Sequence, residues 1–182
     1  MKILDIKILR RYTVSMTGTI RDEFDAAREQ WSKERPDLDL SGIELLWRIS
    51  FLHKYLRNLA GKRLGRFDLP MWSFDVLAAL RRSGSPYQVT PTELCAATQL
   101  SSGAMTNRLD RLQEAGMVER LPAPNDRRGV LIQLTQSGRE LVDKAATVRF
   151  EQANDAVSSL TSNERHQLAA LLRKLVVDHT SE

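Results

Sequence analysis

Apolar side chains recur every three to four positions along most of this chain, which is the spacing of one face of an α-helix. Outside the central region the pattern predicts helices over residues 19–34, 41–64, 69–82, 135–159 and 161–178. Pro36 ends the first of them, and Ser41 is a suitable N-cap for the second. Thr161 and Glu164 have the spacing of a capping box, so the last helix begins there.

The central region has shorter elements with sharper boundaries. Thr90-Pro91-Thr92-Glu93 is a capping box with proline at the first helical position, so a helix begins there and ends near Gln99. A second helix begins at Ser101 or Ser102 and stops at Gly116, the residue type expected just past a helix C-terminus.

Two segments of strand composition follow, Met117–Leu121 and Val130–Thr135, with Pro122–Gly129 as the loop between them. The order of short helix, tight turn, longer helix, strand, arginine-bearing loop and strand is typical of a winged helix-turn-helix. That motif places one helix in the major groove of DNA. The predicted fold class is therefore mainly α with a small β-hairpin wing (α+β).

Longer helices flank this motif on both sides. We expect a DNA-binding region at 69–135, N-terminal helices at 18–68 and C-terminal helices at 136–182. The flanking helices have apolar faces that need a cover, and a second copy of the chain is the simplest one, so we expect a homodimer. Charges interrupt any signal-peptide core in residues 1–17. We expect this segment to be a disordered leader, or a misassigned start with Met16 as the first residue.

Composition narrows the class of protein further. The 182 residues carry a net charge of +4, which suits a polyanionic partner. No apolar run is long enough to span a bilayer, so we expect no membrane partner. The single cysteine, Cys95, excludes a disulfide framework within the chain and fits a reducing compartment, so we expect a cytoplasmic protein.

Motifs of catalysis and of cofactor binding are missing from the sequence. It contains no Gly-rich phosphate loop, no nucleophile motif and no paired catalytic carboxylates. His53, His166 and His179 do not have the spacing of metal ligands. We therefore expect neither an enzyme nor a protein with a metal or cofactor.

The helix over residues 102–115 has one apolar side. On a helical wheel at about 100° per residue, Met105, Leu109 and Leu112 form a core stripe. Polar residues lie broadly opposite. A solvated helix face is the ordinary interpretation of such a polar side, and DNA recognition is the interpretation that its place in the motif favours.

Five residues of this helix and its N-terminal end are candidates for DNA contact. Ser101 and Ser102 are small, so the backbone can approach a phosphate closely, which the helix dipole also favours. Thr106, Asn107 and Arg111 lie on or near the polar side and are suitable donors to bases or phosphates.

The loop between the strands is the second candidate contact. Arg127 and Arg128 at a hairpin tip can reach a neighbouring minor groove or its phosphates, where negative potential concentrates. Asp126 has the wrong sign for DNA, so we expect it to orient Arg128 through a local ion pair.

A second set of charges is expected to lie against protein. Asp75 stands in the middle of a helix that is apolar nearly all round, and such a carboxylate needs a nearby cation. Arg108 flanks the core stripe and Arg120 lies on the following strand, so both are candidates. From the residues alone, a buried ion pair with a purely structural role is favoured over a binding site, because buried pairs are often only structural.

The segment from Thr92 through Leu134 closely resembles the MarR family of bacterial transcription regulators. The family's wing carries an Asp-x-Arg pattern, which Asp126 and Arg128 match. The resemblance extends over roughly residues 19–180 and is specific through the order of its motifs. It implies a homodimer with interlocked terminal helices, a palindromic operator, and release of DNA when a small molecule binds.

Four positions are similar to the urate-responsive subgroup of that family. The subgroup's pocket has a tryptophan on an extra N-terminal helix, an aspartate on the third helix and two arginines. These correspond to Trp31 in WSKERPDLD, Asp75 in FDVLAAL, Arg108 in SSGAMTNRLDRL and Arg120 in MVER. The resemblance implies a repressor that an anionic aromatic metabolite such as urate releases from DNA.

Two alternatives remain open at this point. One is a MarR-like regulator with a different trigger, such as a phenolic compound, another organic acid or oxidation of Cys95. The other is a protein-interaction module that uses the winged fold without DNA. Dependence of binding on salt and on Arg127 and Arg128 separates the DNA-binding interpretation from this one.

Overall fold

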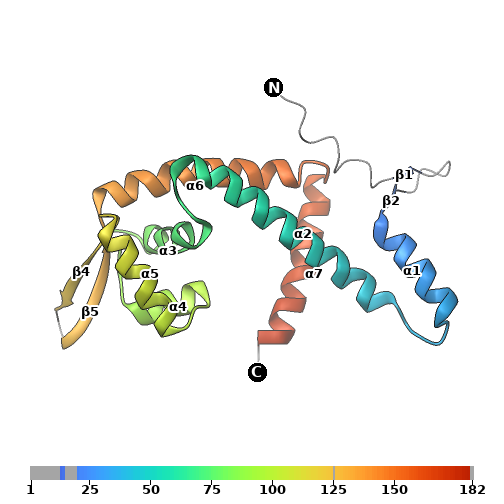
Figure 1. Ribbon diagram of the computed structural model, residues 1–182, viewed down its shortest axis with the longest axis horizontal. Helices are drawn as coiled ribbons and strands as arrows, with labels where there is room; N and C mark the ends of the chain where they lie inside the picture. Colours follow the sequence, from blue (N-terminus) through green and yellow to red (C-terminus); the bar gives the residue numbers. More distant parts are fainter. Residues whose placement is uncertain (1–12, 15–19, 125, 181–182) are drawn as a thin grey trace. The chain divides into compact units, whose positions relative to one another are not determined.

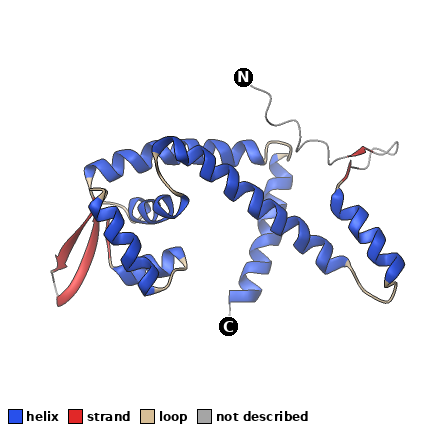
Figure 2. Cartoon of the chain, viewed as in Figure 1, coloured by secondary structure: helices blue, strands red, loops and turns tan. Residues whose placement is uncertain are grey.

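The computed structural model of the protein describes the main chain of residues 13–14, 20–124 and 126–180, and the side chains of residues 21–124 and 129–180. Helices dominate this described part, with two small antiparallel sheets beside them (Figures 1 and 2). Contacts divide the chain into two units, Met1–Arg57 and Asn58–Glu182. Apart from two residues of the first strand, the predicted leader lies outside the described residues.

The first unit contains a two-stranded sheet, a helix and most of a second helix. Its elements are β1 (Thr13–Val14), β2 (Ile20–Arg21), α1 (Glu23–Glu34) and the N-terminal part of α2 (Ser41–Leu64). The helix predicted from residue 19 begins four residues later, because Ile20 and Arg21 pair with β1 instead.

Asp22 determines where α1 begins. Its carboxylate accepts the N–H groups of Phe24 and Asp25, at 2.9 and 3.2 Å. The Asp25 carboxylate in turn accepts the N–H of Asp22 at 2.8 Å, which completes a capping box. Helix α2 differs from its prediction in a similar way, since Ser41 is its first residue and the Asp39 carboxylate accepts the Ser41 N–H.

Aromatic side chains join α1 to α2. The ring of Phe24 stacks on Trp47 with 6.3 Å between centroids and meets the edge of Phe51 at 5.8 Å. Phe51 stacks in turn on Tyr55 one turn later. These contacts give Trp47 a packing role and place the start of α1 against the middle of α2.

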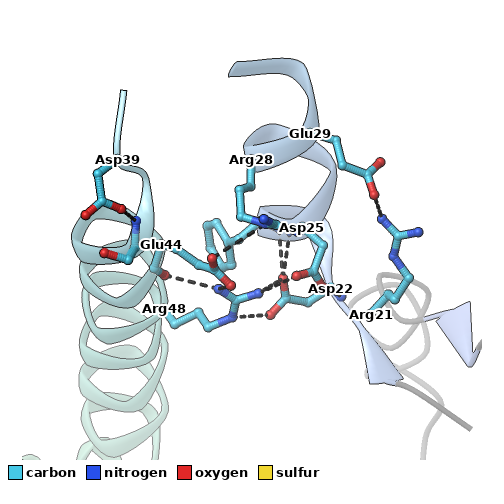
Figure 3. A network of polar contacts seen from close by, with 10 residues as sticks. Arg21, Asp22, Asp25, Arg28, Glu29, Asp39, Glu44 and Arg48 are labelled. Atoms are coloured by element: carbon cyan, nitrogen blue, oxygen red, sulfur yellow. Dashed lines mark hydrogen bonds and ion pairs between the residues drawn. The ribbon is translucent and has the colours of Figure 1, made fainter. Parts of the chain in front are cut away.

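Arg48 of α2 joins the same two helices through charge (Figure 3). Its guanidinium bonds both oxygens of Asp22, at 2.8 and 3.0 Å, and an oxygen of Asp25 at 2.9 Å. It also bonds Glu44 of its own helix at 3.1 Å. Three carboxylates therefore converge on one arginine, and charge-assisted bonds of this kind are among the strongest in proteins.

The Arg48 cluster shifts the titration of its members. Partial burial of Arg48 lowers its pKa. The hydrogen bonds that it donates to Asp22 and the charges of the three carboxylates raise the pKa by more, so the pKa of Arg48 rises. The pKa of Asp25 falls, chiefly because it accepts the Asp22 N–H and also because of the Arg48 charge. Because the folded-state pKa of Asp25 is lowered, its carboxylate contributes to the stability of the fold at pH values above the ordinary carboxyl pKa. That contribution is lost as the pH falls through the lowered pKa.

The second unit holds the remaining elements. These are the end of α2, a 3-10 turn at Gly65–Phe67, α3 (Met71–Arg82), β3 (Gln88–Val89), α4 (Pro91–Thr98), α5 (Ser102–Glu114), β4 (Val118–Ala123), β5 (Asp126–Leu134), α6 (Gln136–Ala156) and α7 (Ser162–Thr180). The predicted mainly helical fold with a small antiparallel wing is confirmed.

Helix α3 is the centre of the core in this unit. It packs against α4, α5 and α6, and buries Phe74, Val76, Leu77 and Leu80. The other elements complete the core with Leu64, Leu94, Met105, Leu109, Leu112, Val118, Ile132, Leu134, Val142 and Ala145. The positions of α4 and α5 therefore depend on α3.

Helix α7 shows the opposite pattern. Thr161 and Glu164 form the predicted capping box at its start, yet no residue of the helix is buried within the chain. Its exposed apolar residues are Leu168, Leu171, Leu172, Leu175, Val176 and Val177. No helix in the described part of the chain is long and apolar enough to cross a membrane.

A close approach of two backbone segments fixes the first turn of α6 beside Met117, just after the end of α5. Thr135 caps α6, and its hydroxyl also donates to the carbonyl oxygens of Gly116 and Met117, at 2.8 and 3.0 Å. Gly138 in the first turn of α6 lies so close to Met117 that a methyl group would overlap the Met117 carbonyl oxygen. Only glycine fits at this position.

We expect Gly138→Ala to lower the free energy of unfolding by about 2 kcal/mol, because the overlap involves backbone that cannot move aside. The matched control is Gly61→Ala in α2, where a methyl group meets nothing within 4 Å. That change should raise stability by about 0.5–1 kcal/mol through helix propensity. Urea unfolding at one protein concentration measures both, and equal effects would contradict the packing described here.

We expect Arg48→Ala to detach α1 from α2, because three carboxylates would then lie together without their cation. Loss of charge-assisted bonds should speed amide exchange in residues 23–34 by about tenfold or more, with α3 to α5 unchanged. Hydrogen–deuterium exchange measures this. The control is Arg35→Ala, which removes an exposed pair with Asp37 two residues away. Unchanged exchange in α1 of the Arg48 variant would rule out the tether.

Candidate nucleic-acid interface

Helices α4 and α5 form the predicted helix-turn-helix. The capping box at Thr90 and Glu93 is present, with Pro91 as the first residue of α4. Gln99 ends α4 in the left-handed region at φ 56°, so the chain turns tightly into α5. The predicted elements and their boundaries are confirmed here to within a residue or two.

The buried stripe of α5 is the predicted one. Met105, Leu109 and Leu112 are 1–3% exposed and belong to the core around α3. Burial of this stripe fixes the rotation of α5 about its own axis, so the opposite side must face solvent. Helix α5 ends at Glu114 with Ala115 as its C-cap, and Gly116 follows at φ +69°, a conformation that favours glycine.

Each candidate residue on α5 for DNA contact is exposed: Ser101, Ser102, Thr106, Asn107 and Arg111. The Ser101 hydroxyl caps the helix by accepting the Ala104 N–H at 3.4 Å. The Thr106 hydroxyl donates to the Ser102 carbonyl at 3.0 Å. The small N-terminal end and the polar side of α5 therefore form one continuous exposed surface, suited to the phosphates and base edges of a groove.

The wing is longer than its prediction. Strands β4 and β5 pair from Val118↔Leu134 to Pro122↔Val130, and a further pair joins Ala123 to Asp126 (Figure 1). The predicted loop at Pro122–Gly129 is therefore wrong in its extent. A strand end with an irregular register tolerates proline, because not every amide there is needed for the ladder.

The irregularity in register falls beside the wing arginines. Arg127, Arg128 and Gly129 stand between the paired positions Asp126 and Val130, opposite the step from Pro122 to Ala123. Such a bulge bends a strand and increases its twist. The side chains of Asp126, Arg127 and Arg128 lie outside the described part, so their predicted roles stay predictions.

A third strand that the sequence analysis missed ties the wing to the body. Gln88 and Val89 form β3, which pairs with Gln133 and Ile132 of β5. Two residues give too short a pattern for a period-2 alternation to be recognised. The sheet order is β3-β5-β4, with β5 in the centre.

Arg108, predicted for an effector site, packs on an aromatic ring. Its guanidinium carbon lies 5.7 Å from the ring centroid of Trp72 in α3. Both side chains line a hollow of about 290 Å³, together with Gly103, Ala104, Asn107 and Arg111. Arg108 thus lies against the body, as its wheel position indicates, yet in the same hollow as two candidate DNA contacts.

Arg120 has partners other than Asp75. It donates to the Asp110 carboxylate and to the Gln113 amide oxygen of α5, each at 2.6 Å. The antiparallel return of β4 after Gly116 brings Arg120 back beside the last turns of α5, which sequence spacing alone did not reveal. This contact also neutralises Asp110 on the polar side of α5, where a free carboxylate would repel DNA.

Asp75 and Trp31 lie in other surroundings. Asp75 is partly buried and lines a groove of about 660 Å³ between α3, α4 and α6. Apolar residues such as Phe74 and Val142 form much of that groove, and Arg81, Arg82 and Arg149 add positive charge. Trp31 belongs to the other unit, on α1, and is 48% exposed. In the described residues no cluster of metal-ligating side chains is found.

Comparison with known proteins shows the family to which this chain belongs. A model described as MarR family matches residues 67–129. The HTH-type transcriptional regulator PecS of Dickeya dadantii is 35% identical over 147 residues, 81% of this chain and 89% of PecS. The chain belongs to the MarR family. The multiple antibiotic resistance protein MarR of Escherichia coli is 33% identical, over 79% of this chain and 99% of that one.

A solved structure of a relative includes DNA. The crystal structure of a cysteine-to-serine mutant of E. coli MarR complexed with operator DNA superposes with a TM-score of 0.64 at 30% identity, over 80% of this chain and 96% of that one. This MarR-family protein is thus a DNA-binding transcription regulator and not an enzyme. The exposed polar side of α5 and the wing are the candidate DNA-contacting surface of this regulator.

Two aromatic residues near this surface give no signal in the sequence pattern. Trp72 of α3 supports Arg108 of α5. Tyr87 precedes β3 and contacts Arg81 of α3, which is close to it in sequence, and Arg139 of α6, which is distant. Periodicity does not reveal these contacts, because each joins two different elements.

We expect Asn107→Ala and Arg111→Ala each to weaken operator binding by about 1–3 kcal/mol, the range for a base or phosphate contact. A phosphate contact lowers the salt slope by about one, whereas a base contact relaxes sequence preference. Fluorescence anisotropy at several salt concentrations measures both. Arg66→Ala is the control, since it removes an exposed arginine that lies on neither α5 nor α7. Equal losses for Arg111 and Arg66 would contradict a specific surface on α5.

Proposed function

We propose that this MarR-family regulator is a homodimeric repressor that binds a palindromic operator and is released by an anionic aromatic metabolite, with urate as the first candidate. The observation that carries the DNA part of the proposal is the exposed polar side of α5, fixed in rotation by its buried stripe. The urate part is supported by the similarity of four residues to the urate-responsive subgroup of the family: Trp31, Asp75, Arg108 and Arg120.

Exposure of apolar side chains supports the homodimer. On α7, Leu171 is 64% exposed and Val176 is 59% exposed, and no residue of the helix is buried within its own chain. Contiguous apolar surface of this kind is rare on a monomer and marks an interface. A two-fold dimer presents two copies of α5 at a fixed separation, which is what a palindrome requires.

The surroundings of Arg108 support an anionic aromatic effector. A guanidinium beside an indole offers two parallel donors and a flat apolar face. Urate is planar and anionic at neutral pH, so it can accept those donors and stack on a ring. Asn107 and Arg111 line the same hollow. A ligand bound to Arg108 would therefore compete with DNA for neighbouring donors or displace α5.

Trp31, Asp75 and Arg120 belong to the proposed effector set through the sequence match, and none of them lines the hollow beside Arg108. The groove beside Asp75 carries arginines and apolar side chains that suit an organic anion as well. For Arg120, a ligand would have to replace the bonds to Asp110 and Gln113. That exchange would return a free carboxylate to the DNA-facing side of α5, which disfavours the complex with DNA.

A gel-shift titration on DNA directly upstream of the regulator's own gene tests the effector. We expect millimolar urate to abolish binding by the natural protein. In the absence of urate, Arg108→Gln and Asp75→Asn should bind DNA as the natural protein does. Release should need about tenfold more urate, because one charge-assisted bond to the ligand is lost. Arg66→Gln is the control, because it removes an arginine outside the proposed set.

Other outcomes separate the alternatives. Specific binding that ignores urate would keep the regulator and remove urate as its effector. Release by peroxide that Cys95→Ser abolishes would assign an oxidant trigger, and release by a phenol in all variants would assign a phenolic one. No specific binding to any operator would contradict the repressor and leave the protein-interaction module.

A further inference from the structure

Tyr87 contacts two arginines at the base of the wing. Its ring centroid is 5.0 Å from the guanidinium carbon of Arg81 at the end of α3, and 5.0 Å from that of Arg139 near the start of α6. Each cation is attracted to the π-electrons of the ring. One residue therefore joins α3, α6 and the segment that leads into β3.

Arg81 is itself held in place. Its Nε donates to the Asp143 carboxylate of α6 at 2.7 Å. This ion pair offsets part of the positive charge around Tyr87 and ties the end of α3 to α6 a second time. The name "Tyr87 clamp" is used below for Arg81, Tyr87, Arg139 and Asp143.

The main chain of Tyr87 carries the start of the sheet. Its φ of +63° is in the left-handed region, which a residue with an aromatic side chain adopts only when its surroundings hold it there. Its N–H donates to the Gly84 carbonyl at 2.6 Å, and its carbonyl accepts the Leu134 N–H at 3.1 Å. The next residue, Gln88, begins the pairing of β3 with β5.

We propose that Tyr87 is a positioning residue for DNA binding, which fixes the root of the wing relative to α5 through the Tyr87 clamp. Strand β5 is held at its end by Tyr87 and β3, and the rest of the β4–β5 hairpin extends beyond that root. Because a strand rises about 3.3 Å per residue, the hairpin is a lever of about 20 Å. A rotation of about 10° at the root moves its tip by about 3 Å, more than a hydrogen bond tolerates.

The proposal concerns how α5 and the wing contact DNA at the same time, and is independent of the effector. Helix α5 takes its position from the core around α3. The wing takes its position from β4, which follows α5, and from the clamp at the end of β5. Without the clamp the hairpin keeps its ladder but loses one of its two anchors, so phosphate contacts from Arg127 and Arg128 are lost while α5 stays in place.

The test compares Tyr87→Leu with Tyr87→Phe in the natural chain and in an Arg127→Ala/Arg128→Ala background. Operator affinity and its salt slope are measured by fluorescence anisotropy. Tyr87→Phe keeps the ring and should bind within about twofold of the natural protein. Tyr87→Leu should bind about tenfold more weakly, with a salt slope lower by about one to two because wing contacts to phosphate are lost. In the background without wing arginines, Tyr87→Leu should cause no further loss.

Three results would each overturn the proposal. The first is an equal factor of loss from Tyr87→Leu in both backgrounds, which indicates a role outside the wing. The second is a loss from Tyr87→Phe as large as that from Tyr87→Leu. The third is natural affinity in the background without wing arginines, since there would be no wing contact to position. Circular dichroism checks folding, and Arg139→Gln, which removes one side of the clamp, replaces Tyr87→Leu if that variant does not fold.

Discussion

The packing of three buried side chains of α5 against the core around α3 determines the position of both surfaces proposed to contact DNA. Met105, Leu109 and Leu112 leave α5 one rotational position, and that position puts Asn107 and Arg111 in solvent. The same packing sets where β4 begins and therefore where the wing starts. A change in the core around α3 would move both surfaces together, whereas a change at the base of β5 would move the wing alone. In the proposed account, α5 is a contact surface fixed by the core, and the wing is a contact surface that needs a second anchor.

Local signals explain why much of the fold could be predicted. The capping boxes at Thr90 and Thr161 each place a helix start to the residue, because the side chain and backbone that define them lie within three positions. The start of α1 was missed by four residues, since pairing of Ile20 and Arg21 with β1 is a contact between segments. The wing was predicted too short for a related reason. A bulge lets β5 continue through Arg127 to Gly129. The alternation of apolar and polar residues does not predict this bulge.

The candidate DNA surface was predictable for the same local reason, since a helical wheel is geometry within one helix. Partners across elements were not. Arg120 bonds Asp110 and Gln113 because β4 turns back along α5, and Arg108 meets Trp72 because of the way α3 and α5 pack. Charge near Asp75 was expected, but the arginines that line its groove come from α3 and α6. Effector chemistry therefore remains a proposal, while DNA binding follows from the family and the surface.

The most direct test of the account is a selection of binding sites by the purified protein from random double-stranded DNA. A homodimer that uses two copies of α5 should enrich an inverted repeat with half-sites about 10 base pairs apart, centre to centre, or a multiple of that spacing. Enrichment of a single unrepeated half-site would contradict the dimeric arrangement. Absence of any enriched sequence, with a protein shown to be folded, would contradict the role assigned to α5 and the wing.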